Sequence, residues 1–266
     1  MLVRQFHRRR VYMSFFTFER VAEGYAKYRP YYHPLIMKKI RESTGLEGKF
    51  ENALDIGCGT GLSTMALKEI AEHVTGTDNS REMITVAQVK NEEKIPYYQA
   101  AAEDLPFKDQ SFDILTVCGA INWIDRSQFF PEAKRVLKKK GWVIIYDNFI
   151  TEDMHDNTAY SRWYQEQYLT RYPKPPRDES PLTRSECDSY GLHIINDEPY
   201  TNDIVFSLDE YINFIMTQSN VIVAIDTGKE DLTGVKMWMR TTLGPLLPRK
   251  KGIFIFRGHI WYLQLI

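Results

Sequence analysis

The stretch Leu54-Asp55-Ile56-Gly57-Cys58-Gly59-Thr60-Gly61 decides the fold class of this chain. An apolar run that ends with an acid precedes three alternating glycines, and a helical pattern follows them. Glycine adopts turn conformations that other residues adopt only at a cost, so the backbone of such a loop can approach a ligand closely. The GxGxG spacing differs from the GxGxxG fingerprint that receives a pyrophosphate. We therefore predict a cofactor loop that joins a strand to a helix.

The chain around this loop repeats the succession of strand, turn and helix. The expected strands are Asn52–Ile56, Val74–Thr77, Tyr97–Ala100, Phe112–Val117 and Trp142–Asp147, and the expected helices lie near Leu62–Ile70, Arg81–Lys90 and Phe129–Lys138. This alternation is typical of a doubly wound parallel α/β sheet. The run Lys138–Gly141 predicts a helix end, because cations complement the helix dipole and glycine permits a left-handed cap.

The segments on either side do not follow this succession of strands and helices. Phe16 to Ile40 predicts two short helices interrupted at Arg29-Pro30, since proline cannot continue a helix. Leu208–Gln218 and Thr233–Leu243 are also expected to be helical, and Gly252–Ile266 is expected to form a strand pair that turns at Arg257-Gly258. Aromatic side chains recur at helical spacing further upstream, at Tyr160, Trp163, Tyr164 and Tyr168. Such a stripe forms a core more often than it lines a substrate pocket, although both remain open.

Four regions follow from these patterns. We expect a basic, disordered leader at 1–15, with a targeting or binding arm as the alternative and Met13 as an alternative start. A cofactor-binding core with an N-terminal helical cover is expected at 16–150, a mainly helical substrate or lid region at 151–251, and closing strands at 252–266.

Composition excludes several classes of protein. The 266 residues include 34 basic and 35 acidic side chains, so no global charge attracts nucleic acid or an anionic membrane. Cys58, Cys118 and Cys187 are too scattered for a disulfide framework or a metal site, which favours the cytoplasm. No run of about 20 apolar residues predicts a membrane span.

The motifs LDIGCGTG, TGTD, AEDLPF and SFDILTV, in this order and spacing, resemble those of class I S-adenosylmethionine-dependent methyltransferases. The likeness is strongest to the small-molecule branch (type 11) that includes trans-aconitate methyltransferase-like proteins, and it covers residues 53–147. It implies a Rossmann-like class I methyltransferase fold, with a mostly parallel seven-stranded sheet, helices on both faces and a helical substrate-covering region. The implied reaction transfers a methyl group from S-adenosyl-L-methionine to a small organic acceptor by in-line displacement, and S-adenosyl-L-homocysteine is the product. A monomer or homodimer is expected.

The acids of the motifs suit this cofactor. Asp55 can attract the ammonium group, and Asp78, placed 23 positions later, can accept hydrogen bonds from both ribose hydroxyls. The alternative is that Asp78-Asn79-Ser80 simply forms a helix N-cap. Ala102, through its backbone, and Glu103 are expected at the adenine edge, unless Glu103 is solvated on its turn. The remaining expected cofactor contacts are Gly57, Cys58, Gly59, Gly61, Met83, Cys118 and Trp123.

Upstream, Tyr25-Ala26-Lys27-Tyr28-Arg29-Pro30 extends the resemblance. In that branch a Tyr-x-x-x-Arg-Pro segment closes over the methionyl end, which implies that Tyr25 packs beside the cofactor and Arg29 meets its carboxylate. The alternative is a surface tyrosine and an exposed cation.

The catalytic residues stay unassigned. Asn122 stands where related chains often carry histidine, and Tyr25, His33 and Asp147 are further candidates near the mouth of the site. The lack of an Asn/Asp-Pro-Pro-Tyr/Phe tetrapeptide favours oxygen, with carbon as the alternative, as the methyl acceptor over nucleic-acid amino groups. Candidates for binding an anionic group of the substrate are Arg162, Arg171 and Arg240. Two alternatives are a non-catalytic S-adenosylmethionine-binding module and a nicotinamide-dependent oxidoreductase.

Overall fold

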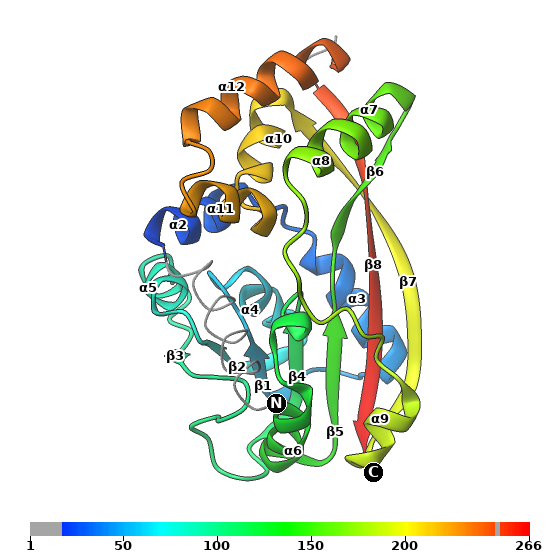
Figure 1. The fold of residues 1–266 in the computed structure, drawn as a ribbon. Helices are drawn as coiled ribbons and strands as arrows, with labels where there is room; N and C mark the ends of the chain where they lie inside the picture. Colours follow the sequence, from blue (N-terminus) through cyan, green and yellow to red (C-terminus); the bar gives the residue numbers. More distant parts are fainter. Residues whose placement is uncertain (1–17, 248–250) are drawn as a thin grey trace, which may run out of the picture. The chain divides into compact units, whose positions relative to one another are not determined.

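The computed structural model describes residues 18–247 and 251–266. The chain divides into two compact units (Figure 1). The first unit holds residues 18–30, Phe149–Pro176 and Thr201–Arg257, and the second holds Tyr31–Asn148, Arg177–Tyr200 and Gly258–Ile266. The predicted leader at 1–15 lies outside the described residues.

The second unit is built on a parallel sheet. Its strands are β1 (Phe50–Ile56), β2 (Ala71–Asp78), β3 (Tyr97–Gln99), β4 (Phe112–Cys118) and β5 (Leu137–Tyr146). They lie in the order β3-β2-β1-β4-β5, and every neighbouring pair is parallel. The five strands predicted from the sequence are therefore confirmed. The mixed α/β sheet is mostly parallel, as expected for a Rossmann-like fold.

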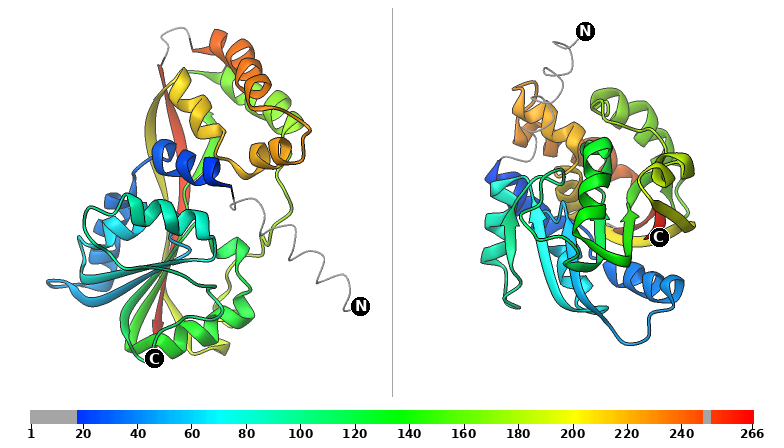
Figure 2. Two further views of the ribbon diagram at one scale, coloured as in Figure 1. Left: turned by 90° about the vertical axis from the view of Figure 1, so that its left-hand side faces the viewer. Right: turned by 90° about the horizontal axis from the view of Figure 1, so that it is seen from below.

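Helices cover both faces of this sheet (Figure 2). Successive side chains of a strand point to opposite faces. Leu54, Leu115 and Ile145 pack in one buried cluster with helix α6 (Arg126–Val136). Their neighbours along the strands, Ala53, Ile114 and Ile144, pack in another cluster with α3 (His33–Thr44) and α4 (Leu62–Leu67). The sheet is thus buried on both sides, which explains why side chains on both faces of its central strands are apolar.

Three further strands complete the eight-stranded sheet of the described residues. Strand β8 (Lys251–Leu265) runs antiparallel to β5 and also pairs with β6 (Phe149–Met154) and β7 (Leu192–Ser207). The predicted strand pair at 252–266 is wrong, because β8 is one continuous strand of 15 residues. Gly258 does not form a turn. It allows its neighbours to pack closely, since a Cβ there would collide with the Asp147 carbonyl oxygen and the Tyr200 ring.

The predicted cap at Lys138–Gly141 is also wrong. Helix α6 ends at Val136, and Leu137 already belongs to β5. Gly141 lacks the left-handed φ angle, which Lys140 adopts instead at 62°. Lys138 forms ion pairs with Glu51 at 2.9 Å and Asp113 at 3.0 Å across the sheet. Lys138 therefore pairs with neighbouring strands and does not cap a helix end.

Short helices complete the second unit. They are α5 (Arg81–Val89), α9 (Arg184–Ser189) and the 3₁₀ turn η1 (Ile121–Trp123).

The first unit contains β6 and a set of helices. They are α2 (Glu19–Tyr28), α7 (Thr158–Arg162), the π-helix η2 (Trp163–Tyr168), α8 (Leu169–Arg171), α10 (Leu208–Ile215), α11 (Ser219–Asp226), α12 (Leu232–Leu243) and η3 (Gly244–Leu246). The predicted break at Arg29-Pro30 is confirmed, since α2 ends at Tyr28 and α3 begins at His33. No helix within the described residues has the length and apolarity that a membrane crossing requires.

The aromatic stripe forms the core of the first unit. Tyr160, Trp163, Tyr164 and Tyr168 are each at most 6% exposed and belong to one buried cluster. The Tyr160 hydroxyl lies 2.6 Å from that of Tyr211, which gives the buried polar ends a partner. The sequence left open whether these aromatic side chains form a core or line a substrate pocket, and the structure supports the core.

Candidate functional site

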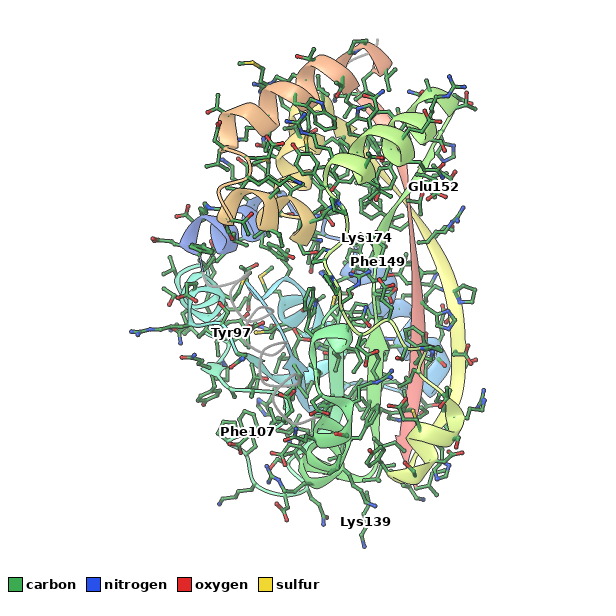
Figure 3. All side chains as sticks on the ribbon, in the orientation of Figure 1. Tyr97, Phe107, Lys139, Phe149, Glu152 and Lys174 are labelled. Atoms are coloured by element: carbon green, nitrogen blue, oxygen red, sulfur yellow. The ribbon has the colours of Figure 1, made fainter. Side chains whose placement is uncertain are left out.

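The loop after β1 leaves open space at its centre. Gly57, Gly59 and Gly61 have φ angles of 67°, 54° and 88°. A Cβ at Gly57 would lie 2.6 Å from the Ala120 Cβ, and one at Gly61 would lie 2.5 Å from the Tyr97 hydroxyl (Tyr97 is labelled in Figure 3). No atom lies within 4 Å of a Cβ built on Gly59. The outer glycines are therefore fixed by packing, whereas the middle one exposes its backbone to open space.

Asp55 ties the loop to its surroundings. The side chain is fully buried, and it accepts hydrogen bonds from Ser63 at 2.5 Å, Thr64 at 2.7 Å and Thr116 at 2.8 Å. Burial raises the pKa of Asp55 to about 6, and the three hydroxyls oppose this rise. Its oxygens thus hold β4 and the first turn of α4, so an attraction to a ligand's ammonium group stays a prediction.

Asp78 holds the loop from the end of β2. Its Oδ2 accepts the backbone N–H of Gly59 at 2.9 Å, and its Oδ1 accepts that of Ser80 at 2.8 Å. Burial raises the pKa of Asp78, and these two bonds oppose the rise. Ser80 is the N-cap of α5 and accepts the N–H of Met83 at 3.2 Å. The capping role therefore falls to Ser80, and Asp78 connects the cap to the glycine loop.

The neighbours of Asp78 have different exposures. Asn79 is exposed, and its carbonyl accepts a hydrogen bond from Gln99 at 3.1 Å. Met83 is buried, with 3% of its surface exposed.

In the turn that follows β3, the Glu103 carboxylate hydrogen-bonds within the protein. Asp104 closes the turn by donating its N–H to the Ala101 carbonyl at 3.2 Å. Glu103 accepts the N–H of Asp125, the N-cap of α6, at 2.8 Å, while Ala102 packs into the core against that helix. Glu103 thus has a structural partner in addition to its predicted place at the adenine edge.

The two cysteines of the motifs occupy different environments. Cys58 is buried in a small cluster with Ile84 and Tyr97, where burial raises its thiol pKa well above the ordinary value. Cys118 ends β4 with its Sγ 3.3 Å from the Tyr32 hydroxyl, and burial raises its pKa to about 12. Both thiols therefore stay protonated at neutral pH. Trp123 lies partly exposed in η1.

Tyr25 and Arg29 belong to the first unit. The Arg29 guanidinium stacks on the Tyr25 ring at 4.1 Å and donates to its hydroxyl at 2.7 Å and to the Thr217 carbonyl at 2.8 Å. Its Nε is buried with no hydrogen-bond partner among the described residues. The predicted contacts of this pair with a cofactor stay predictions.

Sequence reasoning missed a group of tyrosines at the ends of β4 and β5. Tyr32 reaches Cys118, Tyr146 lies 3.2 Å from His33 Nδ1, and Tyr200 donates to the Asp147 carbonyl. Burial raises the pKa of all three phenols. Tyr31-Tyr32-His33 stands out in the sequence, but its partners come from distant strands.

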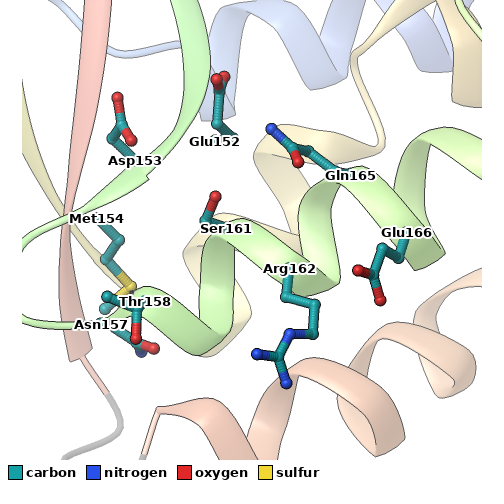
Figure 4. Close-up of a pocket in the computed structure, with 9 residues that line it drawn as sticks. All are labelled: Glu152, Asp153, Met154, Asn157, Thr158, Ser161, Arg162, Gln165 and Glu166. Atoms are coloured by element: carbon teal, nitrogen blue, oxygen red, sulfur yellow. Dashed lines mark hydrogen bonds between the residues drawn. The ribbon is translucent and has the colours of Figure 1, made fainter.

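A pocket in the first unit has a volume of about 430 Å³ (Figure 4). Arg162 lines it and makes no ion pair within the described residues, whereas Arg171 pairs with Glu230 at 2.7 Å and Arg240 with Asp209 at 2.8 Å. The other lining residues are Glu152, Asp153, Met154, Asn157, Thr158, Ser161, Gln165 and Glu166. No group of three or more metal-binding side chains lies together in the described part of the chain.

A family model described as a methyltransferase domain matches residues 54–145, the segment that carries the glycine loop and both acids. The chain contains a class I methyltransferase domain. A candidate type II methyltransferase of Anaeromyxobacter dehalogenans has a similar solved structure, with a TM-score of 0.65 and 20% identity. The match covers 90% of this chain and 98% of that one, and it shows that the fold extends beyond the methyltransferase domain.

Curated relatives share the methyltransferase domain over part of their length. A demethylmenaquinone methyltransferase of Thermotoga maritima is 38% identical over 38% of this chain and 45% of its own. A candidate methyltransferase of Dictyostelium discoideum is 28% identical over 60% of each chain. The chain thus spans about half the length of these relatives. The predicted trans-aconitate methyltransferase-like branch is not singled out and stays a prediction.

Proposed function

We propose that this protein transfers a methyl group from S-adenosyl-L-methionine to an oxygen atom of a small organic acceptor. One observation carries the proposal: the glycine loop of the methyltransferase domain leaves open space at Gly59, directly beside the Asp78 carboxylate. This place lies at the carboxyl ends of parallel strands, where open α/β sheets bind ligands.

The residues around Gly59 fit an adenosyl ligand. A carboxylate offers about four lone-pair positions, and backbone N–H groups use two of those on Asp78. The remaining positions suit the two hydroxyls of a ribose. The loop needs no positively charged side chain for this ligand, because S-adenosylmethionine has no phosphate group.

When bound, the cofactor supplies a methyl group that its sulfonium already activates. The chain's own contribution is to hold the acceptor in line and to exclude water, and no covalent enzyme intermediate is required. Asn122 carries no titratable group, so it can orient an acceptor but cannot remove its proton. The name of the Thermotoga maritima relative, a demethylmenaquinone methyltransferase, supports a small-molecule acceptor.

Calorimetric titration of the full chain tests the cofactor assignment. We expect micromolar binding of S-adenosylmethionine and S-adenosylhomocysteine and no binding of NADH. Formation of S-adenosylhomocysteine with members of a pooled metabolite set then identifies the acceptor. A folded protein that binds NADH and neither adenosyl ligand would show that the proposal is wrong, and methylation of tRNA or DNA alone would remove the small-molecule acceptor.

A further inference from the structure

Asp147 directly follows β5, at the edge of the sheet where ligands bind. Its backbone is fixed from two sides: its N–H donates to the His259 carbonyl at 3.3 Å, and its carbonyl accepts the Tyr200 hydroxyl. Its Oδ1 accepts the N–H of His259 at 3.0 Å. Gly258 permits this close approach, because any Cβ there would collide with the Asp147 carbonyl. The carboxylate therefore has one orientation.

The second oxygen of this carboxylate is left open. Within residues 18–247 and 251–266, Oδ2 of Asp147 receives no hydrogen bond, and the side chain stays partly exposed. The contacts of the main chain and Oδ1 already fix the end of the strand, so the fold does not need Oδ2. A rigidly held carboxylate with one open oxygen suits contact with a ligand.

Four other titratable groups at this edge are poor proton acceptors. Tyr32 and Cys118 stay protonated at neutral pH because burial raises their pKa values. Burial lowers the pKa of His33 to about 4, and its Nδ1 already faces the Tyr146 hydroxyl. Asp55 is also a carboxylate, but three hydroxyls surround it and no part of it is exposed.

The environment of Asp147 leaves it ionised yet able to take a proton. Burial raises its pKa to about 6, while the N–H of His259, the His259 ring and Arg177 oppose the rise. The groups that face it are His259 on β8, Tyr200 on β7, Arg177 before α9, and Tyr32 and Cys118, whose own pKa values its charge raises. A base with a pKa just below the working pH is efficient at accepting a proton.

We propose that Asp147 is the catalytic base, which takes the proton of the acceptor's hydroxyl group on Oδ2. This inference rests on the proposed function and adds the substrate class: a small molecule with a phenol-type or enol-type hydroxyl, which must lose its proton to be methylated. The acceptor O–H bond breaks and its proton moves to Oδ2. The oxygen forms the new bond to the methyl carbon, and the sulfur keeps the electron pair of the broken C–S bond. Asp147 later releases the proton to water.

The pKa of Asp147 can be measured directly. Full-length protein labelled with ¹³C at the aspartate carboxyl carbons is titrated by NMR with S-adenosylhomocysteine bound. We expect two resonances with pKa values near 6, one from Asp55 and one from Asp147. The Asp147 resonance is the one that disappears in Asp147→Asn and stays in the control Asp109→Asn, an exposed carboxylate paired with Arg135. A wild-type pKa below about 4.5 for Asp147, close to the ordinary aspartate value, would overturn the proposal.

Turnover gives the second readout. With a panel of catechols, other phenols and enols, we expect Asp147→Asn to lower kcat by about 100-fold or more, with no change in the affinity for S-adenosylmethionine. In the wild type, kcat should rise with pH through about 6 and then level off. Full turnover by Asp147→Asn would overturn the proposal, and a panel in which no compound reacts would overturn the proposed substrate class. Absence of S-adenosylhomocysteine binding in the wild type would instead overturn the proposed function itself.

Discussion

The backbone N–H of Gly59 donates to Oδ2 of Asp78 at 2.9 Å, which joins the open centre of the glycine loop to the end of β2. The same carboxylate accepts the N–H of Ser80 at the start of α5. One side chain therefore positions the loop and the neighbouring helix at once.

Replacing this carboxylate should weaken cofactor binding. In Asp78→Ala two N–H groups lose their acceptor, and a buried unsatisfied group costs about 1–3 kcal/mol. We expect the Kd for S-adenosylmethionine, measured by calorimetry, to rise at least about 10-fold. Asp78→Asn keeps one acceptor oxygen, so its Kd for S-adenosylmethionine should lie between those of the wild type and Asp78→Ala. Unchanged affinity in a folded Asp78→Ala protein would remove Asp78 from the cofactor site.

Gly57→Ala should mainly lower the stability of the fold, whereas Gly59→Ala should mainly weaken the binding of S-adenosylmethionine. Both positions have positive φ angles, which cost a residue with a Cβ about 1 kcal/mol or more. At Gly57 the new methyl also meets Ala120, so unfolding in urea should reveal a further loss of about 1–3 kcal/mol. At Gly59 the methyl enters open space, and the main loss should be in affinity for S-adenosylmethionine. Equal stability of the two variants would contradict this difference.

The fold of the methyltransferase domain could be predicted because its evidence is local. The apolar strand, the glycine loop and the acid that ends β2 are each visible within a few residues. The sequence also placed Asp78 correctly at the end of its strand and Glu103 correctly on a turn. Their hydrogen bonds to Gly59 and Asp125 could not be predicted, because these bonds link different strands and turns.

The remaining elements depend on contacts that are distant in the sequence. Strand β8 continues through Gly258 because β5 and Tyr200 pack against it, and no neighbouring residue predicts this. Helix α6 stops at Val136 because Leu137 pairs with Phe112 on β4. In both cases sheet pairing prevailed over the turn and capping preferences of glycine.

A pair of adjacent substitutions should confirm that the aromatic stripe is a core. Trp163 is buried, and it stacks with Tyr168 at 5.7 Å and Trp238 at 5.8 Å, whereas Arg162 is exposed. We expect Trp163→Ala to lower the free energy of unfolding by about 3–5 kcal/mol and Arg162→Ala to change it by less than about 0.5 kcal/mol. Urea denaturation followed by circular dichroism measures both. A small effect of Trp163→Ala would contradict the core assignment.

Stability should depend on pH through Asp55. Its pKa is about 6 in the folded protein, against 3.8 for an ordinary aspartate. As pH rises from about 4 to about 6, the unfolded chain gives up this proton while the folded protein keeps it. The folded state then binds more protons, so the free energy of unfolding falls as pH rises. The contribution of Asp55 is fully present below pH 4 and is lost above pH 6.

Comparison with Asp55→Asn isolates this contribution, because both proteins share every other titrating group. The asparagine cannot ionise, but it also loses one acceptor oxygen for the three hydroxyls, which lowers its stability at all pH values. We expect the stability difference between wild type and variant to shrink by about 1–3 kcal/mol between pH 4.5 and pH 7.5. Urea denaturation at the two pH values measures it. A constant difference would show that the buried carboxylate keeps an ordinary pKa, and the hydroxyls would then compensate fully for its burial.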